Sequence, residues 1–363
     1  MFLRLQTSIH PAMLADVESA AGALGLRIAP VEGAEDLVEL AAARLPGPER
    51  GELVRTFTAL AGVVEVLDRP GEAPLWSSER RAATVVEVGA AVFGGGHASI
   101  IAGPCAVEDG AELLEVARAV RARGATLLRG GAFKPRSSPY AFQGLGERGL
   151  EHLREVREAT GLGIVTEVLD PRDVGAVLDA ADMVQVGARN MANSSLLKEL
   201  ATVDRPVLLK RGFGATVEEF LGAAEYLLCG GNERVVLCER GVRGFDQVTR
   251  NLLDVGAIAH LRAATHLPVI ADPSHAAGRS DLVRALGRAG MAAGADGLMV
   301  EVHLDPAAAL SDGQQAIGPD ELEGLVEDAS ALCQLDGRTL LTGDRSLPHS
   351  PLSTSPTHLR GTA

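Results

Sequence analysis

From residue 97 onward, short apolar runs alternate with longer segments that carry hydrophobic residues on one face. The apolar runs are continuous rather than alternating, which is typical of strands buried on both faces of a parallel sheet. The eight strands predicted in this way are Ser99–Gly103, Thr126–Arg129, Gly163–Glu167, Met183–Gly187, Pro206–Lys210, Arg234–Cys238, Pro268–Ala271 and Gly297–Glu301. The helices predicted between and after them include Glu108–Ala122, Glu147–Ala159, Thr216–Leu228, Ser280–Ala293 and Pro319–Leu332.

This regular alternation of strand and helix predicts a closed barrel. Eight such units in roughly 240 residues match a (β/α)8 TIM barrel, which typically takes about 250 residues. We therefore predict an α/β protein in which residues 97–338 form the barrel. A doubly wound open sheet is the alternative, but the glycine-rich fingerprint expected after its first strand is missing from the sequence.

The first 75 residues have a different pattern of short strands and few helices. Strands are predicted at 2–7, 27–31 and 62–67, and helices at 11–24, 35–45 and 49–60. This mixture indicates a small α+β domain of the ferredoxin-like type. Because the predicted barrel has a complete set of strands of its own, we expect this domain to serve regulation or assembly rather than chemistry. Residues 76–96 are predicted to form a linker and a hairpin. Residues 339–363, rich in Ser, Pro and Thr, are predicted to be a disordered tail.

The composition excludes several functional classes. A net charge of −14 argues against general nucleic-acid binding, which requires a basic surface. No apolar run approaches the length of a membrane span, and the first residues lack the apolar core of a signal peptide. Four cysteines in 363 residues are too few for a disulfide framework. We therefore expect a reduced, cytoplasmic protein that acts on small molecules.

Four residues with metal-binding side chains lie at or just after predicted strand ends. Cys105 follows the first strand, His275 the seventh, and Glu301 and Asp312 end or follow the eighth. These strands are neighbours in a closed barrel, and active sites lie at the carboxyl ends of barrel strands, so the four side chains should meet. Singly, each has a structural explanation, such as a helix cap for His275 or a core thiol for Cys105. Together they predict a divalent-metal site that manganese, iron, cobalt or zinc would fit.

Positively charged residues occupy the ends of the other strands. They are Arg129, Lys134, Arg136, Arg189, Lys210, Arg211 and Arg240. Lys and Arg often flank strands on solvated loops, but five loops on one face of an acidic protein favour the binding of several phosphates or carboxylates. Arg136 and Ser137 offer a guanidinium and a hydroxyl suited to a phosphate monoester, although a serine-rich loop is more often a plain turn.

Several motifs in the predicted barrel resemble those of one enzyme family. They are Gly103–Glu108 (GPCAVE), Leu128–Tyr140 (LRGGAFKPRSSPY), Gly187–Met191 (GARNM), Leu209–Gly212 (LKRG), Cys238–Gly241 (CERG), Asp272–His275 (DPSH), Glu301–His303 (EVH) and Leu310–Gln315 (LSDGQQ). At these residues the chain resembles the 3-deoxy-D-arabino-heptulosonate 7-phosphate (DAHP) synthases, type I, β subgroup.

The resemblance implies condensation of phosphoenolpyruvate with erythrose 4-phosphate and water to DAHP and phosphate, the first step of the shikimate pathway. It implies metal binding by Cys105, His275, Glu301 and Asp312. It implies that phosphoenolpyruvate is held by Arg129, Lys134, Arg189, Lys210 and Arg240, and the aldose phosphate by Arg136 and Ser137. We expect the metal to polarise the aldehyde, and Lys134 to protonate the developing alkoxide. Glu167 is expected to orient Lys210 or the attacking water; a plain salt bridge at the strand end is an equally good interpretation.

Three alternatives remain open at this point. The synthases of 3-deoxy-octulosonate 8-phosphate carry Ala-Asn where this chain has Pro135 and often lack the metal cysteine, so Pro135 and Cys105 favour a DAHP synthase. A second alternative is a synthase of a related sugar acid in secondary metabolism. A third is a barrel that has lost catalysis and serves as a binding partner, against which the complete set of metal ligands argues. We expect a homo-oligomer, either a dimer or a tetramer.

Overall fold

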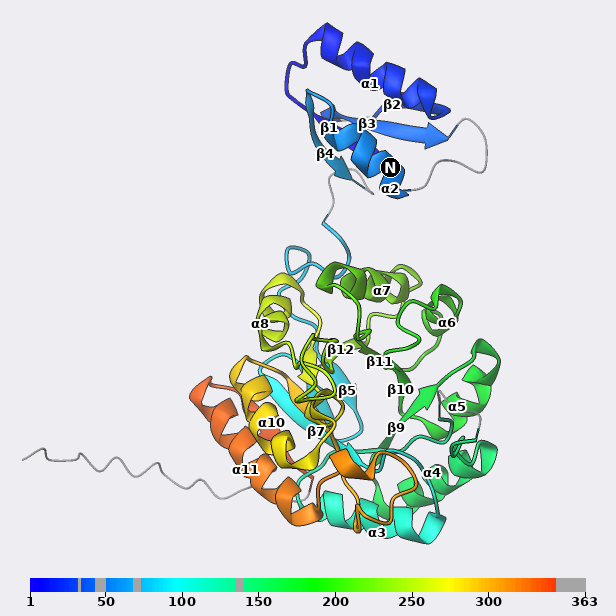
Figure 1. Ribbon diagram of the computed structural model, residues 1–363, viewed down its shortest axis with the longest axis vertical. Helices are drawn as coiled ribbons and strands as arrows, with labels where there is room; N and C mark the ends of the chain where they lie inside the picture. Colours follow the sequence, from blue (N-terminus) through cyan, green and yellow to red (C-terminus); the bar gives the residue numbers. More distant parts are fainter. Residues whose placement is uncertain (32–33, 43–49, 68–72, 135–139, 344–363) are drawn as a thin grey trace, which may run out of the picture. The chain divides into compact units, whose positions relative to one another are not determined.

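The computed structural model describes residues 1–31, 34–42, 50–67, 73–134 and 140–343, and these form two units (Figure 1). The first unit comprises Met1–Ala73, and the second begins at Pro74. Each unit has a hydrophobic core of its own, which is the defining property of a domain.

The N-terminal unit is a four-stranded antiparallel sheet with two helices. Its elements are β1 Phe2–Leu5, α1 Pro11–Ala23, β2 Leu26–Val31, β3 Ala34–Ala42, α2 Arg50–Thr58 and β4 Val63–Leu67. The strand order β2-β3-β1-β4 with this βαββαβ sequence is the ferredoxin-like arrangement. Leu3, Val17 and Phe57, from β1 and the two helices, are fully buried in one apolar cluster.

The helix predicted at residues 35–45 is wrong, because this segment contains strand β3. Its Ala, Glu and Leu residues favour a helix by intrinsic propensity. In the sheet, however, β3 pairs with both β1 and β2, and Leu40 is buried in the core while Glu39 is exposed. Pairing on both edges and burial of one face outweigh a weak local preference.

The second unit is a closed barrel of parallel strands surrounded by helices. Its strands are β7 His97–Gly103, β8 Leu127–Arg129, β9 Gly163–Val168, β10 Met183–Val186, β11 Val207–Lys210, β12 Val235–Glu239, β13 Val269–Ala271 and β14 Gly297–Glu301. Its helices are α3 Gly110–Ala122, α4 Glu147–Thr160, α5 Val174–Ala180, α6 Ser194–Leu200, α7 Val217–Cys229, α8 Val255–Ala264, α9 Pro273–Ala277, α10 Val283–Ala292 and α11 Pro319–Leu335. Each strand pairs with the next, and β14 pairs with β7. The predicted (β/α)8 barrel is therefore confirmed.

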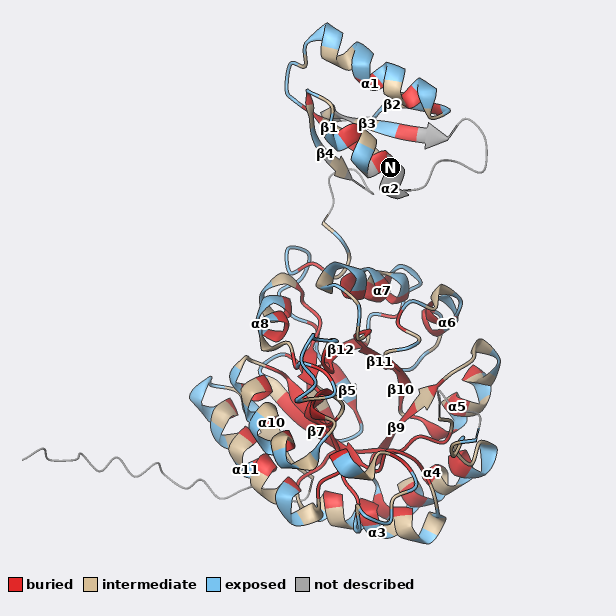
Figure 2. Ribbon diagram, viewed as in Figure 1, coloured by how far each residue is buried: buried red, intermediate tan, exposed pale blue. Residues whose placement is uncertain are grey.

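The predicted hairpin is formed by β5 Val86–Val88 and β6 Ala91–Phe93, and it closes the amino end of the barrel. Its apolar side chains join the inward-facing residues of the barrel strands in one buried cluster. The Ser99 hydroxyl near the start of β7 donates to the Val92 carbonyl and accepts from the Val92 N–H, both at 3.0 Å. Buried residues concentrate in the strands and on the helix faces that cover them (Figure 2). The opposite, carboxyl end of the barrel is the end at which the active sites of such barrels lie.

The predicted tail begins too early, because residues 339–341 form strand β15, which pairs in parallel with the start of β7. Thr339 lies opposite His97, and Leu341 lies opposite Ser99. Leu340 packs against the main core, so an apolar side chain and an open strand edge hold these residues in place. Residues 344–363 lie outside the described part of the chain.

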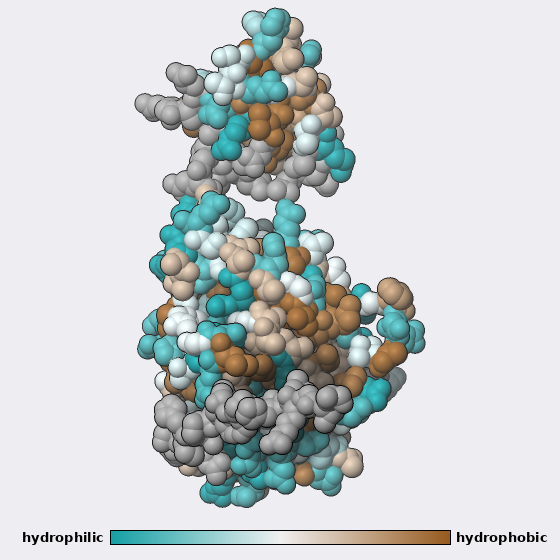
Figure 3. Space-filling view, turned by 90° about the vertical axis from the view of Figure 1, so that its left-hand side faces the viewer, coloured by the Kyte–Doolittle hydropathy of each residue, from teal (hydrophilic) through white to brown (hydrophobic). Residues whose placement is uncertain are grey.

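Hydrophobic and hydrophilic residues are interspersed on the barrel face shown in Figure 3. Among the described residues, no helix combines the length and apolar character needed to cross a bilayer.

Candidate active site

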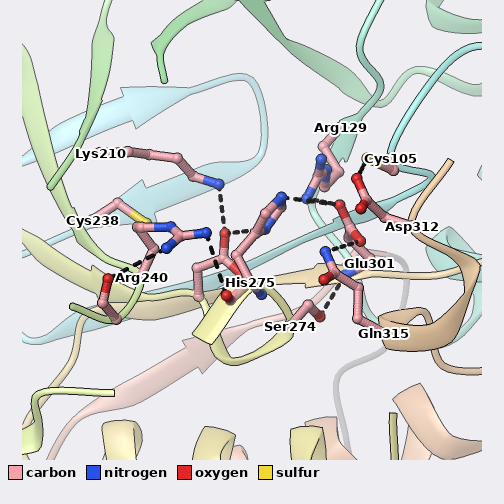
Figure 4. A network of polar contacts seen from close by, with 12 residues as sticks. Cys105, Arg129, Lys210, Cys238, Arg240, Ser274, His275, Glu301, Asp312 and Gln315 are labelled. Carbon is pink, nitrogen blue, oxygen red and sulfur yellow. Dashed lines mark hydrogen bonds and ion pairs between the residues drawn. The ribbon is translucent and has the colours of Figure 1, made fainter. Parts of the chain in front are cut away.

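The four predicted metal ligands come together at the carboxyl end of the barrel (Figure 4). Candidate ligand atoms of Cys105, His275 and Glu301 all lie within 4.8 Å of one another. Asp312 joins this group through its Oδ2, which accepts a hydrogen bond from Cys105 Sγ at 3.0 Å. These side chains belong to the β7–α3 loop, helix α9, the end of β14 and the loop that follows it. Neighbouring strands of one closed barrel therefore bring a sulfur, a ring nitrogen and carboxylate oxygens to one point.

Glu301 stands at the centre of this group and is fully buried. Its Oε2 accepts a hydrogen bond from Gln315 Nε2 at 2.7 Å. Its Oε1 lies 3.1 Å from Arg129 NH1 and 3.2 Å from His275 Nε2, yet it forms no hydrogen bond of adequate geometry with any described residue. A buried carboxylate oxygen without a hydrogen bond is costly, and a bound cation would satisfy it. This atom and the mixed sulfur, nitrogen and oxygen donors around it fit a divalent metal ion.

His275 is held in place by Asp272, the residue that caps helix α9. Asp272 Oδ1 accepts from the His275 backbone N–H at 3.0 Å, and Oδ2 lies 2.8 Å from the ring Nδ1. This contact leaves Nε2 directed at Glu301, the orientation in which carboxylates commonly hold metal-binding histidines. Burial lowers the pKa of His275 to about 4. The ring is therefore neutral at pH 7 and has a lone pair for a metal.

The surroundings of the Cys105 thiol raise its pKa, so that it is protonated when no metal is bound. Burial and the nearby Glu301 carboxylate raise its pKa to about 12, and Lys134 and Arg129 offset this only in part. Lys134 Nζ donates to Cys105 Sγ and to the Cys105 carbonyl, both at 2.9 Å. For Asp312, burial alone would raise the pKa, but the hydrogen bond from Cys105 and nearby positive groups lower it to about 2. Of the four candidate ligands, the Cys105 thiol is therefore the one that must lose a proton when a metal binds.

A cavity of about 340 Å³ opens beside the four residues, and predicted substrate-binding cations line it. The cations are Arg129 at the end of β8, Lys134 after it, Arg189 after β10, Lys210 at the end of β11 and Arg240 after β12. Lys210 Nζ pairs with Asp272 Oδ2 at 2.5 Å, whereas the acceptors of Arg240 among the described residues are the carbonyls of Gly241 and His275, each at 3.3 Å. Burial lowers the pKa of Arg240, since desolvation disfavours the charged guanidinium. An anion in this cavity would offset that cost.

The other residues that the sequence analysis assigned to the site are Glu167, Arg211, Arg136 and Ser137. Glu167 lines the cavity, but its Oε2 accepts from Gln185 Nε2 at 3.0 Å, while the ion pair of Lys210 is with Asp272. Arg211, counted among the cations, does not line the cavity and pairs instead with Glu239 and Asp254 at 2.8 and 3.0 Å. Arg136 and Ser137 lie outside the described residues.

Three residues of the site were missed by the sequence analysis. Asp272 had a usable signal, because it stands three residues before His275 at a predicted strand end. Gln315, whose Nε2 donates to Glu301, had only its place in the motif Leu310–Gln315, and Arg250, which lines the cavity, had no signal. Arg250 NH1 lies 3.1 Å from Gln315 Oε1 and 3.6 Å from Asp312 Oδ1. Both residues lie well beyond strand ends, so the path of a loop decides where they point.

Comparison with known proteins identifies the family. Residues 82–338 match the model of the DAHP synthetase I family. A phospho-2-dehydro-3-deoxyheptonate aldolase of Thermotoga maritima is 48% identical over 254 residues, which are 70% of this chain and 75% of that protein. A 2-dehydro-3-deoxyphosphooctonate aldolase of Nitratidesulfovibrio vulgaris is 34% identical over 256 residues, 65% of this chain and 92% of its own.

Solved structures agree with these similarities. The crystal structure of the DAHP synthase of Thermotoga maritima covers 93% of this chain and 98% of its own, with a TM-score of 0.77 and 40% identity. A truncated form of the Thermotoga maritima enzyme covers 73% of this chain and 98% of its own, with a TM-score of 0.68 and 44% identity. With a family model that matches residues 82–338 and a solved structure that covers 93% of the chain, this chain belongs to the DAHP synthetase I family.

Proposed function

We propose that the cavity at the carboxyl end of the barrel is the active site of a DAHP synthase. The enzyme condenses phosphoenolpyruvate with erythrose 4-phosphate and water, and it releases DAHP and phosphate, the first step of the shikimate pathway. The observation that carries the assignment of the site is the arrangement of its charges. A thiol, an imidazole and two carboxylates lie together beside a cavity that several cations line, which suits a metal together with substrates rich in phosphate and carboxylate.

We propose that Cys105, His275, Glu301 and Asp312 hold a divalent ion, with manganese, iron, cobalt and zinc as the candidates. Such an ion, when bound, supplies a Lewis acid that polarises the aldehyde carbonyl. The structural support for such an ion is Glu301 Oε1, which is buried and forms no hydrogen bond within the described part of the chain. Asp272 fixes the ring of His275, and Gln315 fixes the second oxygen of Glu301.

We propose that phosphoenolpyruvate binds to Arg129, Lys134, Arg189, Lys210 and Arg240. Arg189 and Arg240 both line the cavity and can pair with the carboxylate and phosphate of phosphoenolpyruvate. The aldose phosphate is assigned to Arg136 and Ser137, which follow Lys134 in the chain. This arrangement would hold the two substrates in one cavity. The translational and rotational entropy needed to bring their reacting carbons together would then be lost on binding and not in the reaction step.

The bond-forming step follows from these positions. C3 of phosphoenolpyruvate attacks the aldehyde carbon, and the carbonyl oxygen becomes an alkoxide that takes a proton. Lys134 is the proposed donor, because its Nζ lies 2.9 Å from Cys105 Sγ, between the metal ligands and the cavity. Water then adds to C2, and phosphate leaves with the C2–O bond electrons. Glu167, on the cavity wall and hydrogen-bonded to Gln185, is proposed to orient that water.

The reaction is tested by measuring phosphate release from phosphoenolpyruvate with each of two aldoses. We expect rapid release with erythrose 4-phosphate and slow release with arabinose 5-phosphate. Preference for arabinose 5-phosphate would assign the chain to the octulosonate reaction. The Thermotoga enzyme is 48% identical and the octulosonate enzyme 34%, which favours the first outcome.

We further propose that the enzyme acts in the cytoplasm as a homo-oligomer. Its phosphorylated substrates support the location. Phe245, Val248 and Leu252 are exposed apolar side chains of the loop after β12, and burial between subunits would remove them from water. Sedimentation equilibrium measures the oligomeric state.

A further inference from the structure

Asp312 has an unusual backbone conformation in the loop between β14 and α11. Its φ of 54° and ψ of 24° lie in the left-handed region, which residues other than glycine rarely adopt. Such a conformation costs on the order of 1 kcal/mol and persists where the surroundings enforce it. The next residue, Gly313, lies so close to the Pro306 carbonyl that a Cβ there would approach it to 2.1 Å. The loop therefore needs external contacts to keep the Asp312 carboxylate beside Cys105.

Glu108, in the segment between β7 and α3, supplies one such contact. Its two carboxylate oxygens lie 2.9 and 3.0 Å from the backbone nitrogen of Leu310, and they accept the N–H of that residue. Glu108 stands three residues after Cys105, and Leu310 stands two residues before Asp312. One charged hydrogen bond thus fixes the spacing between the segments that carry the thiol and the carboxylate. Glu108 is the last residue of the motif Gly103–Glu108, and the proposed reaction assigns its carboxylate no other role.

A second contact holds the start of the same loop. His303 Nδ1 accepts the backbone N–H of Asp305 at 3.1 Å, and Nε2 lies 3.2 Å from Glu112 Oε1 on α3. Because Nδ1 accepts, the ring proton belongs on Nε2, which then donates to Glu112. Glu108, Glu112 and His303 lie close enough to hold an ion. In this tautomer, however, neither ring nitrogen has a free lone pair for a metal, so the group acts as a brace between α3 and the loop.

We propose that Glu108 is a positioning residue that holds Asp312 in its metal-binding place through the Leu310 N–H, with the His303–Glu112 pair as a second support. The inference rests on the proposed function, in which Asp312 is a metal ligand. Glu108 itself is not one of the proposed metal ligands and does not line the cavity. Loss of its carboxylate should loosen one metal ligand and leave the other three in place. Outer partners of metal ligands typically change metal affinity by about 10- to 100-fold.

The test compares manganese binding to the full-length, metal-free chain by isothermal titration. We expect Glu108→Ala to weaken binding by about 10- to 100-fold, and Glu108→Gln, which keeps an acceptor oxygen, by no more than about fivefold. Glu115→Ala is the matched control, because Glu115 is an exposed carboxylate of α3 whose partner is Arg118 at 2.8 Å. It should bind manganese normally. With saturating cobalt, Glu108→Ala should retain the sulfur-to-cobalt absorption of Cys105.

Asp312→Ala and the double variant Glu108→Ala/Asp312→Ala complete the design. If Glu108 acts through Asp312, the double variant should bind manganese no more weakly than Asp312→Ala alone. Fully additive losses would overturn the inference, as would a Glu108→Ala protein that melts at a lower temperature but binds manganese normally. Normal binding by Asp312→Ala would instead overturn the ligand assignment of the proposed function, and the inference with it.

Discussion

The two sides of the cavity differ in how their charges are balanced. On the metal side, Glu301 is surrounded by Arg129, His275 and Gln315, and Asp312 accepts from Cys105. On the other side, the hydrogen bonds that Arg240 forms with other described residues all go to backbone carbonyls. Within the described part of the chain, neither Arg240 nor Arg189 forms an ion pair with a carboxylate.

This difference indicates that the two sides bind by different means. The metal side is assembled in advance by contacts within the protein, so an ion would meet a nearly complete set of ligands. The cation side retains positive charge that only an anion from outside can offset, so substrate binding there should carry a large electrostatic gain. Asp272 belongs to both sides, because it contacts His275 and also pairs with Lys210.

The largest effect is expected from removing a metal ligand. Cys105→Ala or His275→Ala should abolish metal retention and reduce turnover by roughly a thousandfold or more, because Lewis-acid stabilisation is worth several kcal/mol and 1.4 kcal/mol is tenfold in rate. Both residues lie beyond the strands that form the barrel core, so circular dichroism should show an intact fold. Activity in excess chelator, after verified metal removal, would contradict the metal assignment.

The cation side should respond through substrate affinity. Arg240→Ala should raise the KM for phosphoenolpyruvate, and Arg136→Ala the KM for erythrose 4-phosphate. In the sequence, Arg240 follows β12 and Arg136 follows β8, and these two strands are not neighbours in the barrel. Truncating one partner of a buried charged pair costs about 2–5 kcal/mol, or at least about thirtyfold in affinity. Steady-state kinetics with each substrate varied in turn measures both. If the two variants weaken the same substrate, the assignment of the two phosphate sites is wrong.

Asp272→Asn should affect both sides at once. The amide keeps an acceptor for the His275 backbone N–H but loses the negative charge that faces the ring and Lys210. Metal affinity should fall by about 10- to 100-fold, the usual effect of changing an outer partner of a ligand, and the KM for phosphoenolpyruvate should also change. A change in only one of these quantities would show that the two sides are independent.

A smaller effect is expected from pH on metal binding. At pH 7, the pKa of about 4 for His275 and about 2 for Asp312 leave both ready to bind, and the pKa of Glu301 is lowered too. The Cys105 thiol, with a pKa raised to about 12, keeps its proton. Metal binding should therefore release about one proton, and affinity should rise about tenfold per pH unit below the thiol pKa. Titration calorimetry in buffers of different ionisation enthalpy counts the protons; a count near zero would show that Cys105 is not a thiolate ligand.

The barrel could be predicted from sequence because each strand is a continuous buried run. The prediction for the last strand, Gly297–Glu301, matches β14 at both ends. Since active sites lie at one end of such strands, the meeting of Cys105, His275 and Glu301 followed from the fold. The sequence analysis wrongly counted Arg211 among the cations of the site. Successive residues along an extended chain point to opposite sides, so Lys210 faces the cavity and Arg211 does not.

Contacts made by loops and by the small sheet were less predictable. Arg250 and Gln315 reach the site through loops whose course depends on the finished structure. Strand β3 was predicted as a helix because its residues favour a helix by intrinsic propensity. It is a strand because it pairs with two neighbouring strands. In each case the deciding interactions come from residues distant in sequence, which local patterns do not record.

The smallest effect on catalysis is expected from removing the N-terminal unit. The barrel has its own closed sheet and core, and the truncated form of the Thermotoga maritima enzyme has a solved structure. A chain beginning at Ala82 keeps the β5–β6 hairpin, so kcat should stay within about twofold of the full-length value, as expected for an independent domain. Any inhibition of the full-length protein by tyrosine, phenylalanine or chorismate should disappear.

A second truncation, beginning at Pro74, separates the loss of the domain from the loss of its connecting segment. In that segment, the backbone N–H groups of Leu75 and Trp76 donate to Glu225 at 3.1 and 3.3 Å, and Thr265 Oγ1 donates to the Trp76 carbonyl at 2.5 Å. The chain beginning at Ala82 loses these hydrogen bonds, each worth about 1 kcal/mol, and its Tm should fall by several degrees below that of the Pro74 chain. Kinetics of all three proteins with and without the effectors decides the role of the unit. A folded, metal-loaded but inactive Pro74 chain would mean that the N-terminal unit helps to build the active site, whereas the absence of any effector response in the full-length chain would leave assembly as its role.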